Sequence, residues 1–297
     1  MTLAETISID DRVTEISLPE FWRANFPALS INDRLARTNL RQIEPDPASM
    51  QLWRARMGEE AYLQDISPTL AELAPRLAEA VETCHRLDIP PAFIFLFDEA
   101  WECFFSLDPM LRFFLGENYR VLPDFWTWRL DPQRADAGWR PHRDKGRMAL
   151  RSDGSPVSLT VWIPLTDAIP QNGCMYMLPA NRDPVYGTEN ETRWKIDIAK
   201  VRALPAKVGD FLCWNQAVLH WGGEASRFAP HPRMSMALEF QIGERAPFNS
   251  PLIQPLANLS FDIRLRLIGK QILQYKHMYP LAARFEALAQ RLLAPAR

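Results

Sequence analysis

The sequence predicts a mixed fold in which a β core, either a barrel or a double-sheet jelly roll, is flanked by α-helices at both ends. Residues 46–88 and the tail from about 259 repeat apolar positions at helical spacing. Residues 119–243 instead carry short β-branched and aromatic runs between Pro, Gly, Asp and Asn clusters. With 297 residues, of which 47% are hydrophobic, the chain can bury a sizeable core. We expect one domain over 1–297, with a mainly helical part at 1–118, the jelly-roll core at 119–243 and C-terminal helices at 244–297.

The first helical stretch is expected from about Asp46 to Asp88, with Ser67 and Pro68 as a cap and first turn. Its apolar positions recur at three- and four-residue steps and predict an amphipathic outer helix. They are Leu70, Leu73, Leu77, Ala80, Val81 and Cys84. The next segment, FIFLFDEAWECFFSLDPMLRFFLG, is apolar on most sides, so we expect a buried helix or a strand leading into one.

Short segments with strand composition follow, separated by turn residues. They are Tyr119–Leu130, Val157–Leu165, Cys174–Leu178, Val201–Leu204, Asp210–Trp214 and Met234–Ile242. The Asn-Gly within Gln171–Gly173 predicts a hairpin turn between two core strands. Gly209 and Asp210 are expected to open the strand that ends at His220. The tail returns to helical spacing, with Ile268, Ile272, Leu273, Leu288 and Leu292 as its apolar positions.

Charge and cysteine content exclude several classes of partner and site. Lys plus Arg (34) nearly balances Asp plus Glu (36), so no global positive field favours nucleic acid. No run approaches the roughly 20 apolar residues of a spanning helix, and the acidic start is unlike a secretory signal. We therefore expect no membrane association and a cytoplasmic location. The cysteines fit no paired spacing for zinc or redox exchange and are expected as buried thiols. They are Cys84, Cys103, Cys174 and Cys213.

Two of the five histidines lie in a pattern that predicts a metal site. In PHRD, His142 and Asp144 are two residues apart, so in an extended segment both side chains point to one side. His220 lies 76 residues beyond Asp144, at the end of a predicted strand. Two imidazoles and one carboxylate form the facial triad that leaves coordination positions of Fe(II) open for a co-substrate and oxygen.

A His-x-Asp pair alone is more often a hydrogen-bonded surface pair than a metal-ligand pair. A second spacing favours the metal site, because Arg233 follows His220 by thirteen residues and begins the strand-like run RMSMALEFQ. Strand alternation places Ser235 and Ala237 on the same face as Arg233. A guanidinium with a hydroxyl two residues on can hold a carboxylate in a bidentate manner.

The segment Val157–Leu165 has two different faces. One face is wholly apolar, with Leu159, Val161, Ile163 and Leu165. The other is mixed, with Ser158, Thr160 and Trp162. We expect the mixed face to point inward, because a pocket for a polar co-substrate needs polar groups. Trp162 is then a possible wall of that pocket, although a purely structural Trp is at least as common.

The region from Tyr119 to Gly243 resembles the phytanoyl-CoA dioxygenase-like branch of the Fe(II)/2-oxoglutarate oxygenases. The resemblance rests on PHRD, SLTVWIPLTDAIPQNGCMYMLPANRD, VGDFLCWNQAVLHWGGEAS and RMSMALEF, which occur in the family's order. It implies a double-stranded β-helix (jelly-roll, cupin-like) core with Fe(II), 2-oxoglutarate and O2 as cofactor and co-substrates. By position, it implies His142, Asp144 and His220 as iron ligands.

The resemblance also implies that Arg233, assisted by Ser235, binds the C5 carboxylate of 2-oxoglutarate, with Trp162 and Thr160 lining that pocket. The chain departs from the family at Ala180-Asn181-Arg182, where Gly-Ser-His is common, and at Gln171, where an acid is common. The first departure is expected to reshape the pocket mouth. Related halogenases lack the carboxylate that Asp144 supplies, so its presence favours oxygen transfer.

The expected activity is therefore hydroxylation of an unactivated C–H bond of a small molecule, with release of succinate and CO2. An amino-acid-like, acyl or secondary-metabolite substrate remains open, as does use of the same oxidant for desaturation, cyclisation or epoxidation. A catalytically silent metal-binding jelly roll and a zinc hydrolase are the alternatives from other classes. One of Trp128 and Arg129 either meets the substrate or simply packs in the core or at the rim, and the basic residues of the PHRD loop either attract a substrate anion or are simply solvated.

Overall fold

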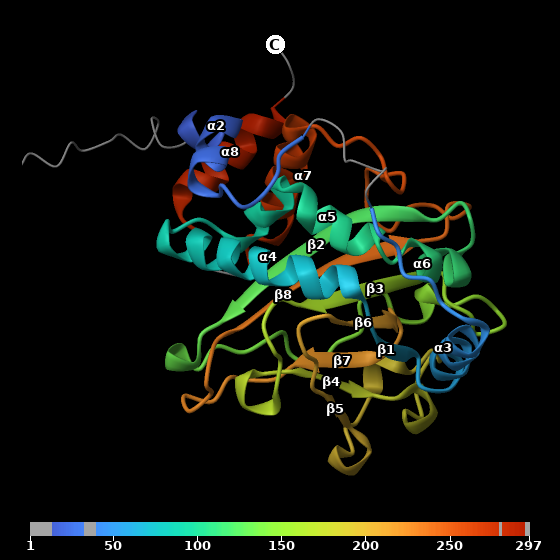
Figure 1. Ribbon diagram of the computed structural model, residues 1–297. Helices are drawn as coiled ribbons and strands as arrows, with labels where there is room; N and C mark the ends of the chain where they lie inside the picture. Colours follow the sequence, from blue (N-terminus) through green and yellow to red (C-terminus); the bar gives the residue numbers. More distant parts are fainter. Residues whose placement is uncertain (1–13, 33–39, 279–280, 295–297) are drawn as a thin grey trace, which may run out of the picture.

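The computed structural model describes residues 14–32, 40–278 and 281–294. Its strands form two antiparallel sheets, one of five strands in the order β1-β6-β3-β8-β2 and one of three in the order β5-β4-β7. The strands are β1 (Tyr62–Ile66), β2 (Arg120–Leu130), β3 (Ser158–Pro164), β4 (Met175–Leu178), β5 (Arg202–Leu204), β6 (Asp210–Asn215), β7 (Leu219–Gly222) and β8 (Arg233–Gln241). The two sheets pack on each other as a jelly roll, which confirms the predicted fold class (Figure 1).

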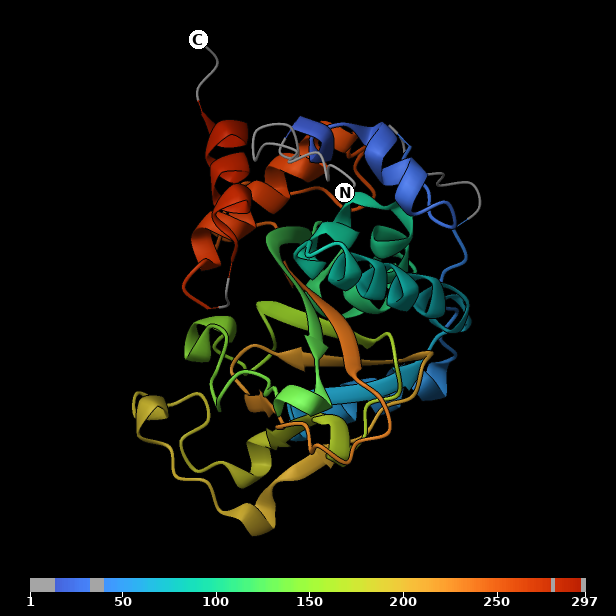
Figure 2. The same cartoon turned by 90° about the vertical axis from the view of Figure 1, so that its left-hand side faces the viewer.

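Helices cover the face of the larger sheet that points away from the smaller sheet (Figure 1). Seen from the side, the α-helices other than α3 form one layer, the five-stranded sheet a second and the three-stranded sheet a third, while α3 lies beside β1 at the level of the sheets (Figure 2). The described α-helices are α2 (Pro19–Asn25), α3 (Pro47–Glu59), α4 (Pro68–Arg86), α5 (Asp98–Phe105), α6 (Asp108–Leu115), α7 (Phe261–Tyr275) and α8 (Ala283–Leu293). No described helix is long and apolar enough to cross a membrane.

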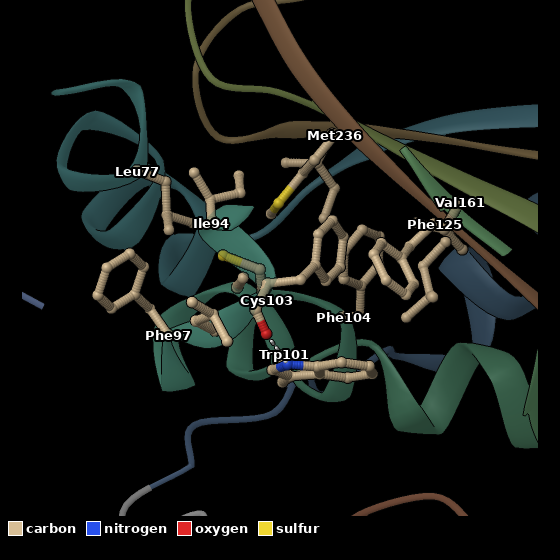
Figure 3. Close-up of a cluster of buried hydrophobic side chains, with 14 of the residues drawn as sticks. Leu77, Ile94, Phe97, Trp101, Cys103, Phe104, Phe125, Val161 and Met236 are labelled. Carbon is tan, nitrogen blue, oxygen red and sulfur yellow. Dashed lines mark hydrogen bonds between the residues drawn. The ribbon is translucent and has the colours of Figure 1, made fainter. Parts of the chain in front are cut away.

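The larger sheet is buried on both faces by two separate hydrophobic clusters. On the helical side, Trp101 and Phe104 of α5 lie among Phe125, Val161 and Met236 of three strands (Figure 3). The alternate residues of the same strands, such as Trp162, pack toward the smaller sheet. Because side chains alternate along a strand, the predicted apolar face of β3 meets the helices and its mixed face points between the sheets. The site described below lies in that inner layer.

The stretch from Asp46 to Asp88 is helical over α3 and α4, as expected, but it is not one outer helix. It is interrupted by β1, which pairs with β6 in the register Tyr62↔Trp214, so the N-terminal part supplies an edge strand of the core sheet. Ala61, at φ 66°, turns the chain between α3 and β1. Pro68 does open α4, although the Ser67 hydroxyl makes no capping hydrogen bond. The buried segment after α4 is helical, comprising a 3₁₀ helix at Pro91–Leu96 followed by α5 and α6.

Two further predictions about the path of the chain are wrong for a shared reason, although Gly209 and Asp210 do open a strand as expected. The Gln171–Gly173 turn does not close a hairpin, because β3 and β4 lie in different sheets. The strand that opens at Asp210 ends at Asn215, and His220 lies in the separate strand β7. A local turn signal does not say whether the chain returns to the same sheet or crosses to the opposite one.

Candidate metal centre

His142, Asp144 and His220 meet at one point between the two sheets. Their possible ligand atoms all lie within 4.8 Å of one another. The Nε2 atoms of His142 and His220 lie 3.4 and 3.5 Å from Asp144 Oδ1. The His220 side chain is 3% exposed and that of Asp144 9%, whereas His142 is 29% exposed and lies nearest to solvent.

Backbone pairing brings the two histidines together. His142 follows β2 in a loop, and His220 lies in β7 of the smaller sheet. Each backbone N–H donates to the other residue's carbonyl oxygen, with both distances 3.0 Å. The chain reaches β7 through a turn in which Val218 N donates to Asn215 O and Ala217 N donates to Asn215 Oδ1.

Hydrogen bonds fix which ring nitrogen of each histidine is available. His142 Nδ1 lies 2.7 Å from Arg140 O, and His220 Nδ1 lies 3.2 Å from Val218 O. A carbonyl oxygen only accepts, so each Nδ1 carries the proton and each Nε2 presents a lone pair to the centre. Burial is the main cause that lowers the pKa of His220 to about 4, which keeps this imidazole neutral at neutral pH.

The carboxylate of Asp144 is oriented through one of its two oxygens. Oδ2 accepts from Thr160 Oγ1 at 2.8 Å and from Trp214 Nε1 at 3.0 Å. Gln216 Nε2 in turn donates to Thr160 Oγ1 at 2.9 Å. Burial opposes ionisation of Asp144, but the two imidazoles and the Thr160 hydroxyl outweigh it and lower its pKa. The ionised group therefore directs Oδ1 at the two Nε2 atoms.

A buried cation lies in the same pocket as this donor set. Arg233 is 2% exposed, and its Nη1 donates to Ser235 Oγ at 2.7 Å. Its Nε has no hydrogen-bond partner, and no carboxylate of the described chain lies within ion-pair distance of its guanidinium. Burial lowers the pKa of Arg233 to about 10. The guanidinium carbon lies 5.7 Å from the ring centroid of Trp162.

The remaining residues expected at the site fall into two groups. Thr160, Trp162 and Trp128 line the pocket of the metal centre. Arg129 does not, because it points to the other face of β2 and pairs with Glu82 and Asp131, each at 3.1 Å. The basic residues of the PHRD loop are largely paired with acids of the chain. Arg143 pairs with Asp183 at 2.6 Å, Lys145 with Glu239 at 3.0 Å and Arg147 with Glu189 at 3.9 Å.

Several pocket-lining residues were not predicted. Trp139 forms an edge contact with His142, with ring centroids 5.4 Å apart, and Trp214 holds Asp144. Glu239 also lines the pocket. Its position could have been found by continuing the alternation of Arg233, Ser235 and Ala237 one step further along β8. The unusual Ala180-Asn181-Arg182 forms a 3₁₀ turn outside this pocket lining.

Comparison with known proteins agrees with this arrangement. A family model described as phytanoyl-CoA dioxygenase matches residues 31–229, which include all three donors but not Arg233. No curated protein matches the chain. The nickel complex of the non-haem monooxygenase ThoJ aligns over 79% of this chain and 98% of its own, with 13% identity and a TM-score of 0.53.

Two other solved structures have a similar fold. The epimerase SnoN, in complex with Fe3+, alpha ketoglutarate and nogalamycin RO, covers 66% of this chain and 85% of its own, with 17% identity and a TM-score of 0.50. AviO1 from Streptomyces viridochromogenes Tue57 covers 68% and 99%, with 16% identity and a TM-score of 0.50. At these identities the likeness is one of fold.

Proposed function

The chain belongs to the phytanoyl-CoA dioxygenase family, and from that premise we propose that it is an Fe(II)- and 2-oxoglutarate-dependent dioxygenase that hydroxylates an unactivated C–H bond of a small molecule. The donor set fits the metal. Two imidazole nitrogens and one carboxylate oxygen, supplied from one side, suit Fe(II) and leave coordination positions for a co-substrate and oxygen.

The single observation that carries the proposal is the uncompensated charge of Arg233. A buried cation without a carboxylate partner is costly, so the pocket is built to receive an anion. The guanidinium and the Ser235 hydroxyl offer adjacent donors, which suit the planar geometry of a carboxylate. The metal donors line the same pocket, so a dicarboxylate could reach both. 2-Oxoglutarate has that form, with a keto-acid at one end and a free carboxylate at the other.

When bound, iron(II) and 2-oxoglutarate would supply the oxidation. One atom of O2 enters succinate as CO2 leaves, and the other enters the C–H bond of the substrate. The residues of the chain provide placement. Arg233 and Ser235 would hold the distal carboxylate, Thr160 and Trp214 keep Asp144 in one orientation, and the indole of Trp162 lies against the guanidinium of Arg233.

Succinate release tests the proposal. Protein loaded with Fe(II) should convert 2-oxoglutarate to succinate and CO2 under air, slowly without substrate and faster with a productive one. Arg233→Met should lose this conversion, while Arg54→Met, which removes an exposed arginine of α3, should retain it. Conversion that persists in Arg233→Met, or that is absent from the iron-loaded wild type with every substrate supplied, would reject the assignment. The mass of the product separates hydroxylation from desaturation.

A further inference from the structure

Glu239 lines the metal pocket at the end opposite Arg233 and belongs to a cluster of charged side chains behind the pocket wall. Glu239 lies on the same face of β8 as Arg233, six positions further along, a step that spans about 20 Å of strand. It is 5% exposed and lies directly opposite Thr160 in the β3–β8 pair, where Thr160 donates to Asp144. Glu239 therefore faces Thr160, the residue whose hydroxyl orients the candidate metal ligand Asp144.

In the described chain, the ionisable groups of this cluster are two carboxyls and only one ammonium. Lys145 Nζ lies 3.0 Å from Glu239 Oε2 and 4.0 Å from Asp124 Oδ2, so two buried carboxylates share one ammonium. Asp124 Oδ1 accepts from Asn249 Nδ2 and Tyr275 Oη, each at 2.6 Å, and both of these donors are neutral. Asp124 Oδ2 makes no hydrogen bond within the described chain, and the partner of Glu239 Oε2 there is the ammonium of Lys145. Burial, which Lys145 does not fully offset, raises the pKa of Glu239 to about 8, so without a second cation this carboxyl keeps its proton at neutral pH, and a bound cation would displace that proton.

Aromatic rings form the adjacent wall of the pocket. Trp126 and Trp128 stack with centroids 6.0 Å apart, and both make edge contacts with Trp139. Trp126 and Trp128 also line a larger cavity of about 450 Å³ between β2 and the C-terminal helices. A substrate that approaches through this cavity would pass the two indoles before it reaches the metal. Indole faces attract cations.

The cations described around the pocket are already paired with acids or assigned to 2-oxoglutarate, so none of them remains to bind an anionic substrate. Arg143 and Arg129 are paired with acids of the chain, and Lys145 lies between two carboxylates. Arg233 is the buried cation without a carboxylate partner in the described chain, and the proposed function assigns it to 2-oxoglutarate. An additional anion near Glu239 would therefore meet two carboxyl groups and, among the described residues, no unpaired cation, whereas a cation would allow both carboxyls to ionise.

We infer that the substrate carries a protonated amine, for which Glu239 is the counterion, while the indoles of Trp126 and Trp128 contact its apolar part. This inference rests on the proposed function, because it places the substrate between the metal centre and the larger cavity. It favours amine-bearing molecules over acyl and phosphorylated ones. Glu239 would be a specificity-determining residue that contacts the substrate rather than the metal.

Calorimetric titration of the anaerobic complex with Fe(II) and saturating 2-oxoglutarate tests the inference without turnover. Three probes share one apolar framework and differ in charge: 3-phenylpropylamine, 3-phenylpropanamide and 3-phenylpropanoate. At about pH 8.5, above the pKa of Glu239 and below that of the amine, the amine should bind about tenfold more tightly than the amide, the size of effect expected for a buried charged hydrogen bond. The carboxylate should bind most weakly. Glu239→Gln, which keeps the shape, should abolish the preference for the amine and leave amide binding unchanged.

Glu189→Gln is the matched control, because it removes one negative charge from a side chain that is 86% exposed. It should retain the preference for the amine. No preference for the amine in the wild type, or a preference that survives Glu239→Gln, would overturn the inference. The visible absorption of the Fe(II)–2-oxoglutarate complex shows whether a variant is folded and binds both ligands, independently of its preference among the probes. If Glu239→Gln loses this absorption, Asp124→Asn should weaken the preference for the amine while keeping the absorption.

Discussion

His142 and His220 face each other as a hydrogen-bonded antiparallel pair, with both backbone N–H···O distances 3.0 Å. The pair joins the loop after β2 to the smaller sheet, so the position of two candidate metal ligands depends on close backbone contact. A Cβ added at Gly138 would lie 2.6 Å from Gly222 Cα, beside this pair.

Gly138→Ala should therefore push the two segments apart, lower the stability by about 1–3 kcal/mol and weaken iron binding. Thermal unfolding and iron titration measure the two effects. Gly58→Ala is the matched control, because a Cβ there meets nothing within 4 Å and the residue lies inside helix α3. It should be neutral or stabilise the protein by up to about 1 kcal/mol. Unchanged iron affinity in Gly138→Ala would show that the close approach does not position the ligands.

Thr160→Val should reduce iron affinity about tenfold to a hundredfold, because it keeps the side-chain shape but removes a donor that orients Asp144. Trp214→Phe should act in the same direction through the second donor. Thr160→Ser, which keeps the hydroxyl, should restore most of the affinity. Competition with a chelator measures this series, and equal affinity in Thr160→Val and wild type would contradict the proposed orienting role.

Arg233→Met should have opposite effects on the apo protein and on ligand binding. Replacing a buried, uncompensated guanidinium with an apolar side chain is expected to be neutral or to stabilise the apo protein by about 1–4 kcal/mol. Saturating 2-oxoglutarate with iron should raise the melting temperature of the wild type by mass action but not that of the variant. A variant that 2-oxoglutarate stabilises as strongly as it does the wild type would show that another group binds the distal carboxylate.

The four cysteines should resist alkylation in the folded protein. Cys84, Cys103 and Cys213 are fully buried, and this burial raises the pKa of each thiol. Cys174 is also buried, and its pKa is likewise raised. Since the thiolate is the reactive form, iodoacetamide at mildly alkaline pH should label the chain quickly only after unfolding. Rapid labelling of the native protein, followed by mass spectrometry, would contradict this burial.

The candidate site was predictable from sequence where the chemistry depends on residue spacing along a single segment. The two-residue step from His142 to Asp144 and the alternation from Arg233 to Ser235 both give side chains that share a face. The pairing of distant segments was not predictable in this way. The strand β1 is short, lacks a regular alternation of apolar and polar residues, and is held by its pairing with β6.

The path of the chain between the sheets could also not be predicted from the local sequence. Asn172 and Gly173 have the composition of a hairpin turn, yet Asn172 uses its side chain to hold Ile169 N and Asp167 O where the chain crosses between sheets. Arg129 and Trp128 are neighbours on one strand, so only the packed structure could decide which of them faces the metal centre.

Anaerobic titration of the apo protein with Fe(II) in the presence of 2-oxoglutarate tests the central claim most directly. We predict that the weak visible charge-transfer band of an iron–keto-acid chelate saturates at one iron per chain in the wild type, and that the band is lost in His142→Ala and His220→Ala. A wild-type protein that binds iron without this band, or a band that persists in both variants, would contradict the account.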